Sequence, residues 1–276
     1  MIINYYNQIT IVIISYKSRN KVLKFIRKIP RYYKIIIVEN SEDINLKNIL
    51  KNFKNVSVYL RQNKGVSSAI NYAVKKIKTK YFFQISPDLD FDFNKLKYFY
   101  IAANNMKNKF SALGPRYINV NKKSHVQSNA KDKIGYVDAV HGSAMFIYKK
   151  NFNLIGGFDE NFFLYFEEND YCRRGKKINL NSYQVNKIKV KKLGDTVEFF
   201  DKIKKQDLSN LLSWHFIWSK FYFFRKHYGY LFSLIYFIPI IIRTIFKLMV
   251  YKNSNKNNMY QKYKFRYEGL KASIMG

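Results

Sequence analysis

The sequence has very few of the residues that form cross-links, metal sites and flexible linkers. Its one cysteine, Cys172, excludes an intrachain disulfide and favours a reducing compartment. The four histidines are scattered along the chain, which argues against a zinc site built from cysteine and histidine. Four prolines and eleven glycines in 276 residues leave little chain for linkers. With 47% hydrophobic residues, the chain is long enough and apolar enough to bury a sizeable core.

Acidic residues are also scarce, because 18 Asp and Glu stand against 50 Lys and Arg, which gives a net charge of +32. Such a charge attracts polyanions, whether nucleic acid, anionic lipid or phosphorylated small molecules. Lys, Asn, Ile, Tyr and Phe are all abundant and all have AT-rich codons, so mutational bias is an equally good explanation of the excess. The charge alone therefore does not define a function.

The first ninety residues alternate between strand-like and helix-like segments. The N-terminus lacks the basic start and small-residue cleavage site of a signal peptide, and its short β-branched run predicts a buried strand instead. Strands are expected at 9–15, 34–39, 56–60 and 81–85, with helices at 20–29, 46–53 and 66–77. This order predicts a mostly parallel, Rossmann-like sheet with helices on both faces.

Polar residues follow three of these strands, at 15–17, 39–41 and 86–90. Ligands of such sheets bind beyond the carboxyl ends of the strands, so these segments are expected to form a binding edge. An acidic residue such as Glu39 can bind ribose hydroxyls there, although in isolation a polar turn is the more ordinary explanation. Neither G-x-G-x-x-G nor a P-loop is present, which argues against classical dinucleotide binding.

The segment Ser86–Asp90 places carboxylates directly after a predicted buried strand. Mg²⁺ is held by one or two protein carboxylates together with water and substrate phosphates, and a metal there can stabilise a departing diphosphate. Asp88 and Asp90 are therefore the candidate ligands of Mg²⁺ or Mn²⁺. In isolation, D-x-D is more often a solvated turn.

The middle of the chain is less regular, with strands expected at 110–118, 137–148 and 187–192. It holds the densest group of acidic residues in the sequence: Asp159, Glu160, Glu167, Glu168 and Asp170. Capping of a helix N-terminus explains one or two carboxylates but not five. Adjacent carboxylates repel each other, which can raise a pKa and suits a general base.

From Leu211 onward the composition becomes aromatic and apolar. Tyr230–Ile242 carries no charge, and Arg243 and Lys247 follow on one helix face. The run is short of the ~20 residues of a spanning helix. An interfacial helix pair is favoured, with a single span or an ordinary core helix as alternatives. We expect a domain over 1–210, with a nucleotide-binding half 1–92 and a catalytic half 93–210, and a membrane-associating segment over 211–276.

An ordered series of motifs resembles glycosyltransferase family 2 in its rhamnosyltransferase-like branch. The matching segments are IVIISYKS at 11–18, VENS at 38–41, NKGV at 63–66 with AIN at 69–71, SPD at 86–88, GSAMFI at 142–147, IGGFDE at 155–160 and FEENDYCRR at 166–174. The last two segments are the most specific. The resemblance covers residues 9–196 and implies the GT-A fold, followed here by C-terminal helices.

The resemblance implies a role for each matching residue. Glu168 corresponds to the base that deprotonates the acceptor, and Asp88 to the metal ligand on the donor diphosphate. The donor nucleotide would be bound by Ser15, Tyr16, Glu39, Asn40, Asn71 and Asp88. The acceptor side or its supporting residues would be His141, Gly142, Asp159, Glu160, Glu167, Asp170, Arg174 and Lys192. Arg174 would lie near the diphosphate or pair with a carboxylate.

Several positions differ from the family pattern. Glu39 and Glu168 replace aspartates, and Ser86 replaces the first aspartate of the strict D-x-D motif. Lys192 stands where the family often has a histidine, and a lysine there could neutralise phosphate charge directly and weaken the need for Mg²⁺ or Mn²⁺.

The resemblance implies inverting transfer of rhamnose or another hexose from a UDP-, dTDP- or GDP-sugar to a saccharide hydroxyl. The acceptor would be linked to a polyprenyl lipid, in O-antigen or capsule synthesis, on the cytoplasmic face of a bacterial inner membrane with anionic lipid. A nucleotidyltransferase of similar fold is an alternative. A non-catalytic protein that binds membranes or nucleic acid is another, with nucleic acid the less favoured partner.

Overall fold

The computed structural model describes residues 4–119, 126–194, 197, 202–254 and 256–276. Contacts divide the chain into two compact units. The first comprises residues 1–161 and 167–198, and the second comprises 162–166 and 199–276. Each unit is described by itself.

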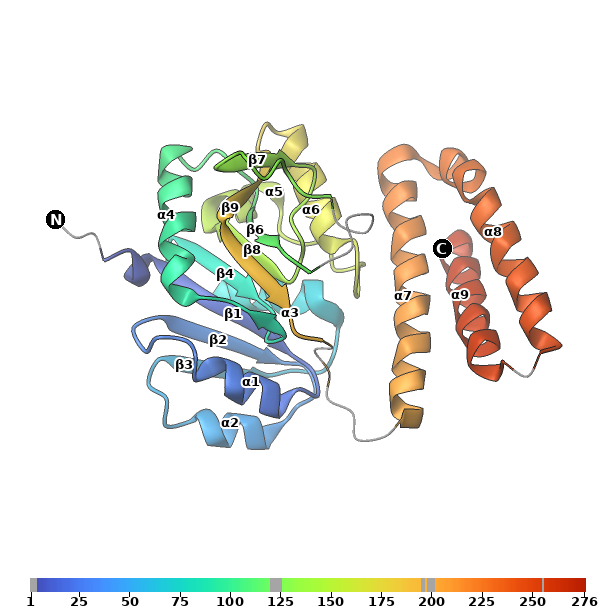
Figure 1. Ribbon diagram of the computed structural model, residues 1–276, viewed down its shortest axis with the longest axis horizontal. Helices are drawn as coiled ribbons and strands as arrows, with labels where there is room; N and C mark the ends of the chain where they lie inside the picture. The colour runs from blue at the N-terminus through green and yellow to red at the C-terminus, as the bar shows by residue number, and fades with distance from the viewer. Residues whose placement is uncertain (1–3, 120–125, 195–196, 198–201, 255) are drawn as a thin grey trace. The chain divides into compact units, whose positions relative to one another are not determined.

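The first unit contains a mixed sheet whose N-terminal half is parallel (Figure 1). Strands β1 (Ile9–Ser15), β2 (Lys34–Glu39), β3 (Val56–Leu60) and β4 (Tyr81–Ile85) lie in the order β3-β2-β1-β4. All four predicted strand ranges match these bounds. The sheet continues through β8 (Ala144–Tyr148), β6 (Leu113–Tyr117) and β9 (Ser182–Lys192) to β5 (Leu89–Asp90), and β7 (Ile134–Val137) pairs with β9.

The strand expected over 137–148 is two strands, β7 and β8. Residues 138–143 between them are not extended, and a hydrogen bond from Ala144 N to His141 O (3.1 Å) closes a turn there. The prediction was wrong because Val137 and Val140, before the turn, and Ala144 and Met145, after it, are all buried, so the sequence resembles an unbroken apolar run. The strand β8 runs antiparallel to β4.

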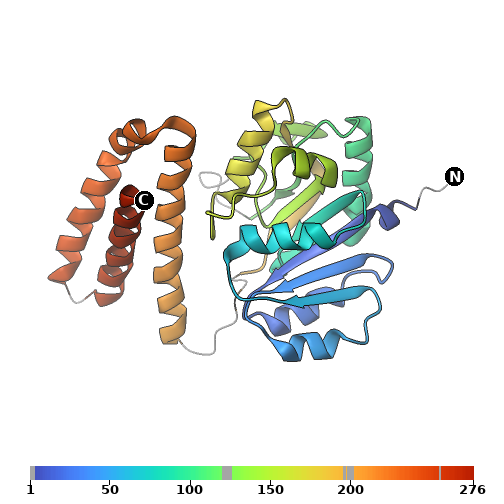
Figure 2. The same cartoon turned by 180° about the vertical axis from the view of Figure 1, so that it is seen from behind.

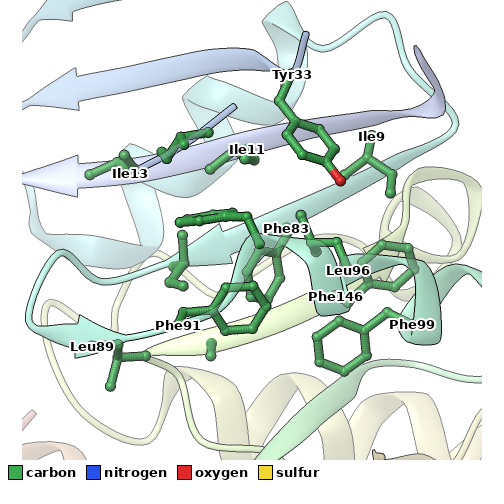
Figure 3. Close-up of a cluster of buried hydrophobic side chains, with 14 of the residues drawn as sticks. Ile9, Ile11, Ile13, Tyr33, Phe83, Leu89, Phe91, Leu96, Phe99 and Phe146 are labelled. Carbon is green, nitrogen blue, oxygen red and sulfur yellow. The ribbon is translucent and has the colours of Figure 1, made fainter. Parts of the chain in front are cut away.

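Alternation along β1 explains why helices cover both faces of the sheet. Ile11 and Ile13 face the helices α1 (Arg19–Ile26), α2 (Ile44–Leu50) and α4 (Leu96–Asn105), in the core shown in Figure 3. Val12 faces the opposite core with α3 (Gly65–Lys76), α5 (Lys149–Ile155) and α6 (Glu167–Lys177), and Figure 2 shows α3 on that side. Strands buried on both faces have continuous apolar sequences, as β1 and β2 do.

The short helices η1 (Tyr5–Gln8) and η2 (Phe93–Lys95) precede β1 and α4. Parallel strands place their carboxyl ends at one edge, and Asn40 N donates to Ser15 O (2.8 Å) where β1 and β2 end. The polar segments that follow β1 and β2 therefore lie together at this edge, as the sequence predicts, and their role in binding stays a prediction.

The second unit consists of α7 (Lys202–Tyr228), α8 (Tyr230–Lys252) and α9 (Asn257–Met275), together with the segment 162–166. Ile217, Phe221, Phe237 and Leu270 form its small core. Gly229, with φ of 89°, ends α7 and allows the chain to reverse into α8. Of the helices that the structure describes, α8 alone is long and apolar enough to cross a membrane.

Candidate active site

Two carboxylates begin α6, and both lie in an environment that disfavours their charge. Glu167 is buried and Glu168 is half-buried. Burial raises the pKa of the Glu168 carboxyl. The pKa of the Glu167 carboxyl is raised well above its ordinary value, mainly by burial and further by the negative charge of Glu168. One oxygen of each carboxylate, Oε2, is buried and accepts no hydrogen bond from the part of the chain that the structure describes.

Gly142 lies directly against this pair. Its backbone donates a hydrogen bond to Glu168, which opposes the rise of the pKa. A Cβ atom at position 142 would lie 3.4 Å from Glu168 Cδ and 3.5 Å from Glu167 Oε1. The absence of a side chain therefore lets the turn before β8 approach both carboxylates closely.

The turn that carries Gly142 also connects the carboxylate pair to the end of β4. His141 Nδ1 accepts from the Ser143 amide (3.1 Å), and Gln84 Nε2 donates to Gly142 O (2.5 Å). Ser86 N donates to Ser143 O (2.8 Å), immediately before Asp88. Because Nδ1 is an acceptor, a neutral His141 ring carries its proton on Nε2.

Tyr117 and Ser143 complete this network, and the sequence did not identify either residue. Their hydroxyls share a hydrogen bond of 2.6 Å, and Ser143 Oγ lies 2.9 Å from His141 Nδ1. Burial raises the pKa of the Tyr117 phenol, and the charges of Asp88 and Glu168 raise it further. The phenol thus lies within electrostatic range of both predicted functional carboxylates. No sequence signal marks it, because β6 is distant in the chain and Tyr117 matches no motif.

Asp88, directly before β5, forms an ion pair with Lys192 at the end of β9. Asp88 is only 3% exposed in its side chain, and Lys192 Nζ lies 3.7 Å from its Oδ2 atom. Asp90 differs from Asp88 in its exposure and its partner. Its side chain is 60% exposed, and its Oδ1 atom lies 3.6 Å from Lys28 Nζ. The structure therefore brings Lys192 to Asp88 and leaves Asp90 on the surface. In the described ranges, no group of three Asp, Glu, His or Cys side chains could hold a metal.

The predicted nucleotide-binding residues of β1 and β2 lie side by side at the sheet edge. Glu39 is 1% exposed, and its Oε1 accepts from the backbone (2.7 Å) and the hydroxyl of Ser41. Ser15 shares a hydrogen bond of 3.0 Å with Ser18. Asn40 Nδ2 donates to Asn63 Oδ1 and Gly65 O, both at 3.5 Å. Tyr16 is half-buried beside them. The longer glutamate is accommodated by folding back onto Ser41.

Asn71 braces the turn that follows α5. Its amide donates to Phe158 O (2.8 Å) and Glu160 Oε1 (2.9 Å), and Phe158 N donates back to Asn71 Oδ1 (3.0 Å). The hydrogen bond from Asn71 lowers the pKa of Glu160. The side chain of Asn71 is thus bonded to the G-G-F-D-E segment, whose Asp159 accepts from Asn161 N (3.0 Å).

Arg174 braces the same turn from α6. Its guanidinium donates to Asp170 (2.8 Å), which is fully buried, and to the carbonyls of Ile155 (2.5 Å) and Gly157 (2.6 Å). Gly156 and Gly157 both have positive φ, so other residues would be strained there. The Asp170–Arg174 pair and the two glycines thus fix the loop that precedes the carboxylate pair.

Comparison with known proteins agrees with this fold and with the motif series. The profile of glycosyl transferase family 2 matches residues 10–227, so the chain belongs to that family. A low-salt glycan biosynthesis hexosyltransferase, Agl10 of Haloferax volcanii, is 24% identical over 197 residues, which cover 63% of this chain and 64% of that protein. The chain therefore spans less than two thirds of that relative.

Solved structures of nucleotide-sugar enzymes share the GT-A fold. The mannosyltransferase PcManGT from Pyrobaculum calidifontis, in complex with GDP-Man and Mn²⁺, has a TM-score of 0.59 at 11% identity and covers 97% of this chain and 87% of that one. S. aureus TarS 1–349 in complex with UDP-GlcNAc has a TM-score of 0.54 at 14% identity. That match covers 98% of this chain and 92% of the TarS chain. At such identities the likeness concerns the fold alone.

Proposed function

We propose that this protein transfers a sugar from a nucleoside-diphosphate sugar to a hydroxyl group of a saccharide, with inversion at the anomeric carbon. The carboxylate pair at the start of α6 carries the proposal, because its raised pKa values suit a group that takes up a proton near neutral pH. Family membership and the nucleotide sugars bound by structural neighbours support the donor class.

Glu168 is the proposed base. The acceptor oxygen attacks the anomeric carbon, the bond from that carbon to the diphosphate oxygen breaks, and the acceptor proton passes to a Glu168 oxygen. The Oε2 atom is suited to this step because the described residues leave it without a hydrogen-bond donor. A single displacement of this kind needs one base and no covalent intermediate, and the bond-making step resembles glycoside hydrolysis in its oxocarbenium-like transition state.

Glu167 contributes to the same step through its charge. Two adjacent, coupled carboxylates cannot both ionise easily, so the pair retains a proton at a pH where isolated carboxyls have lost theirs. Gly142 and the turn around it keep Glu168 in place.

Asp88 and Lys192 are the proposed groups at the donor diphosphate. A divalent cation suits this position, because the nearly buried Asp88 carboxylate is a hard oxygen ligand, and water and phosphate oxygens supply the rest of the coordination. Bound there, the cation would neutralise charge on the departing diphosphate. The structural neighbour PcManGT, solved with GDP-Man and Mn²⁺, supports this proposal. Lys192 adds a positive charge at the same place.

Ser15, Tyr16, Glu39 and Asn40 are the proposed residues of the nucleoside site, at the carboxyl ends of β1 and β2. For the acceptor we propose a lipid-linked saccharide in a glycan assembly pathway at a membrane surface. The exposed apolar face of α8 supports this part of the proposal, as does the glycan-biosynthesis relative. More specifically, we propose rhamnose as the transferred sugar and O-antigen or capsule as the product of the pathway. The proposed location is the cytoplasmic face of a bacterial inner membrane.

A donor screen tests the function, using thermal shift and hydrolysis with UDP-, dTDP- and GDP-sugars, with and without Mn²⁺. We expect stabilisation by one nucleotide class.

Glu168→Gln should lower the transfer rate by at least ~10²-fold, as expected for loss of a general base, while the thermal shift with donor persists. Glu268→Gln, on the exposed surface of α9, is the matched control.

Transfer at the wild-type rate by Glu168→Gln would contradict the assignment of the base. Incorporation of labelled nucleotide into the product would indicate a nucleotidyltransferase. A folded protein that responds to no nucleotide sugar would favour a non-catalytic binding protein.

A further inference from the structure

The residues directly before the carboxylate pair have an unusual backbone. Tyr165 and Phe166 have φ of 69° and 68°, in the left-handed region that bulky residues rarely adopt. Two consecutive aromatic residues in this conformation are strained, and such strain persists only where the surroundings impose it. The chain enters α6 from this turn, and Glu167 follows Phe166 by one peptide bond.

The side chains of this turn pack on α7. The rings of Tyr165 and Phe216 pack edge-to-face, with 5.5 Å between their centroids. The centroid of the Phe166 ring lies 5.7 Å from that of Phe216 and 5.6 Å from that of Phe223. Phe216 therefore contacts both of the strained residues.

The first half of the segment is fixed to α7 in the same way. Phe163 stacks on His215 with 4.5 Å between ring centroids and 13° between the planes. Phe162 is fully buried, and its ring packs edge-to-face on Tyr222 with 4.9 Å between the ring centroids. The whole of 162–166 thus belongs with α7, although the residues on either side of it belong to the first unit.

One hydrogen bond fixes the backbone of the segment. Ser219 is fully buried, and its hydroxyl donates to Leu164 O at 2.8 Å. A serine inside a helix commonly bonds a carbonyl of the preceding turn of its own helix. Ser219 instead bonds a residue 55 positions earlier in the chain, which ties α7 to the segment.

We propose that α7 is a positioning element for the catalytic base, with Phe216 and Ser219 as the positioning residues. They hold the turn at 164–166 in its left-handed conformation, and that conformation sets the start of α6 and the placement of Glu168. Without these contacts the turn would relax to commoner dihedral angles and shift the first residues of α6. The proposal rests on the proposed role of Glu168, and it gives α7 an indirect part in the chemical step.

The test compares four variants of the full chain. Phe216→Ala removes the ring shared by Tyr165 and Phe166, and Ser219→Ala removes the hydrogen bond to Leu164. Phe216→Tyr keeps the ring at a position that is 39% exposed and has room for a hydroxyl. Leu211→Ala, at an exposed site on the same helix, is the control.

We expect Phe216→Ala and Ser219→Ala to lower kcat by about 10- to 100-fold, as displacement of a reacting group by about 1 Å does. KM for the donor and the thermal shift with donor should stay as in the wild type. The acid limb of the pH profile should move to lower pH, because a displaced Glu168 is better solvated and has a lower pKa. Phe216→Tyr and Leu211→Ala should behave as the wild type.

Unchanged kcat and pH profile in both alanine variants would overturn the proposal. So would an equal loss of kcat and donor affinity, which indicates general destabilisation. If Phe216→Ala does not fold, Ser219→Ala makes the same distinction. Activity in Glu168→Gln would instead refute the assigned base, so failure of the proposed function is recognised separately.

Discussion

Two single residues have properties that can be tested directly by substitution, and Lys192 is the first. Its ammonium group lies 3.7 Å from the nearly buried Asp88 carboxylate, where the family often has a histidine. Unlike a neutral histidine, a lysine carries its charge at all physiological pH values. If the donor diphosphate binds beside Asp88, as proposed, the ammonium group of Lys192 would attract it with or without a bound divalent metal.

Lys192→Met should therefore make donor binding more dependent on metal. We expect the thermal shift with nucleotide sugar to weaken in EDTA far more than in Mn²⁺, and residual transfer in EDTA to fall about tenfold, equivalent to about 1.4 kcal/mol. Lys191→Met, the exposed neighbour, is the control. An equal loss with and without Mn²⁺ would show that Lys192 does not share the role of the metal.

Glu167 is the second such residue, because its raised pKa makes the stability of the fold depend on pH. A carboxyl whose pKa is higher in the folded than in the unfolded state favours folding below its unfolded value of about 4.3, and that contribution is lost as the pH rises through the folded value. The protein therefore loses stability from this group towards neutral pH.

Glu167→Gln imitates the protonated carboxyl and should raise Tm at pH 7 by a few degrees, since each unit of pKa difference corresponds to about 1.4 kcal/mol. The difference from the wild type should vanish near pH 4, which thermal melts over pH 4–8 would measure. A lower Tm at pH 7 would show that the charged carboxylate is the favoured form.

At the scale of elements, α8 has one face buried within the protein and an opposite face that is exposed. Ser233, Phe237 and Thr244 are buried on one side. The opposite stripe is apolar and exposed along its whole length: Leu231, Ile235, Ile238, Ile242, Phe246 and Met249. Only 17% of the most apolar 18-residue stretch of α8 is buried within the protein. A helix of this kind suits the boundary between headgroups and acyl chains.

Replacing Ile235 and Ile242 together by glutamate should abolish sedimentation with vesicles of phosphatidylethanolamine and phosphatidylglycerol. Two carboxylates in the stripe are repelled by anionic headgroups and costly in the apolar layer. Leu154→Glu, at an exposed apolar residue of α5, should leave sedimentation unchanged. Membrane binding by the double variant equal to that of the wild type would contradict the interfacial role of α8.

At the scale of the whole molecule, the charge of +32 favours association with any polyanion. Exposed charges are screened within about 8 Å at physiological ionic strength, whereas burial of an apolar stripe is not weakened by salt. Binding that depends on charge alone and binding that also uses α8 should therefore respond differently to salt.

We expect binding to RNA to be lost between 50 and 300 mM NaCl, with a steep dependence on salt concentration. Binding to anionic vesicles should persist over the same range with only a modest decrease, in filter-binding and sedimentation assays run side by side. Salt-resistant binding to RNA, retained in Glu168→Gln combined with Asp88→Asn, would favour a nucleic-acid-binding protein.

Much of the first unit was predictable because short-range patterns determine it. β-branched runs bounded by polar turns predicted the bounds of β1 to β4, and the helix ends differed by one to three residues. The carboxylate group at 159–170 was identified from its density in a basic chain. The turn at 138–143 was missed, since the apolar residues on both sides of a tight turn resemble one strand.

The sequence by itself determined the fold class, the family and the residue types available for chemistry, because these follow from local periodicity and ordered motifs. Only the tertiary structure placed Tyr117 near Asp88 and Glu168, since contacts between distant strands leave no local pattern. Only the tertiary structure likewise separated Asp88 from Asp90 and joined 162–166 to α7. Burial and pairing, which set the charge and the placement of a side chain, are properties of the packed chain and not of its order of residues.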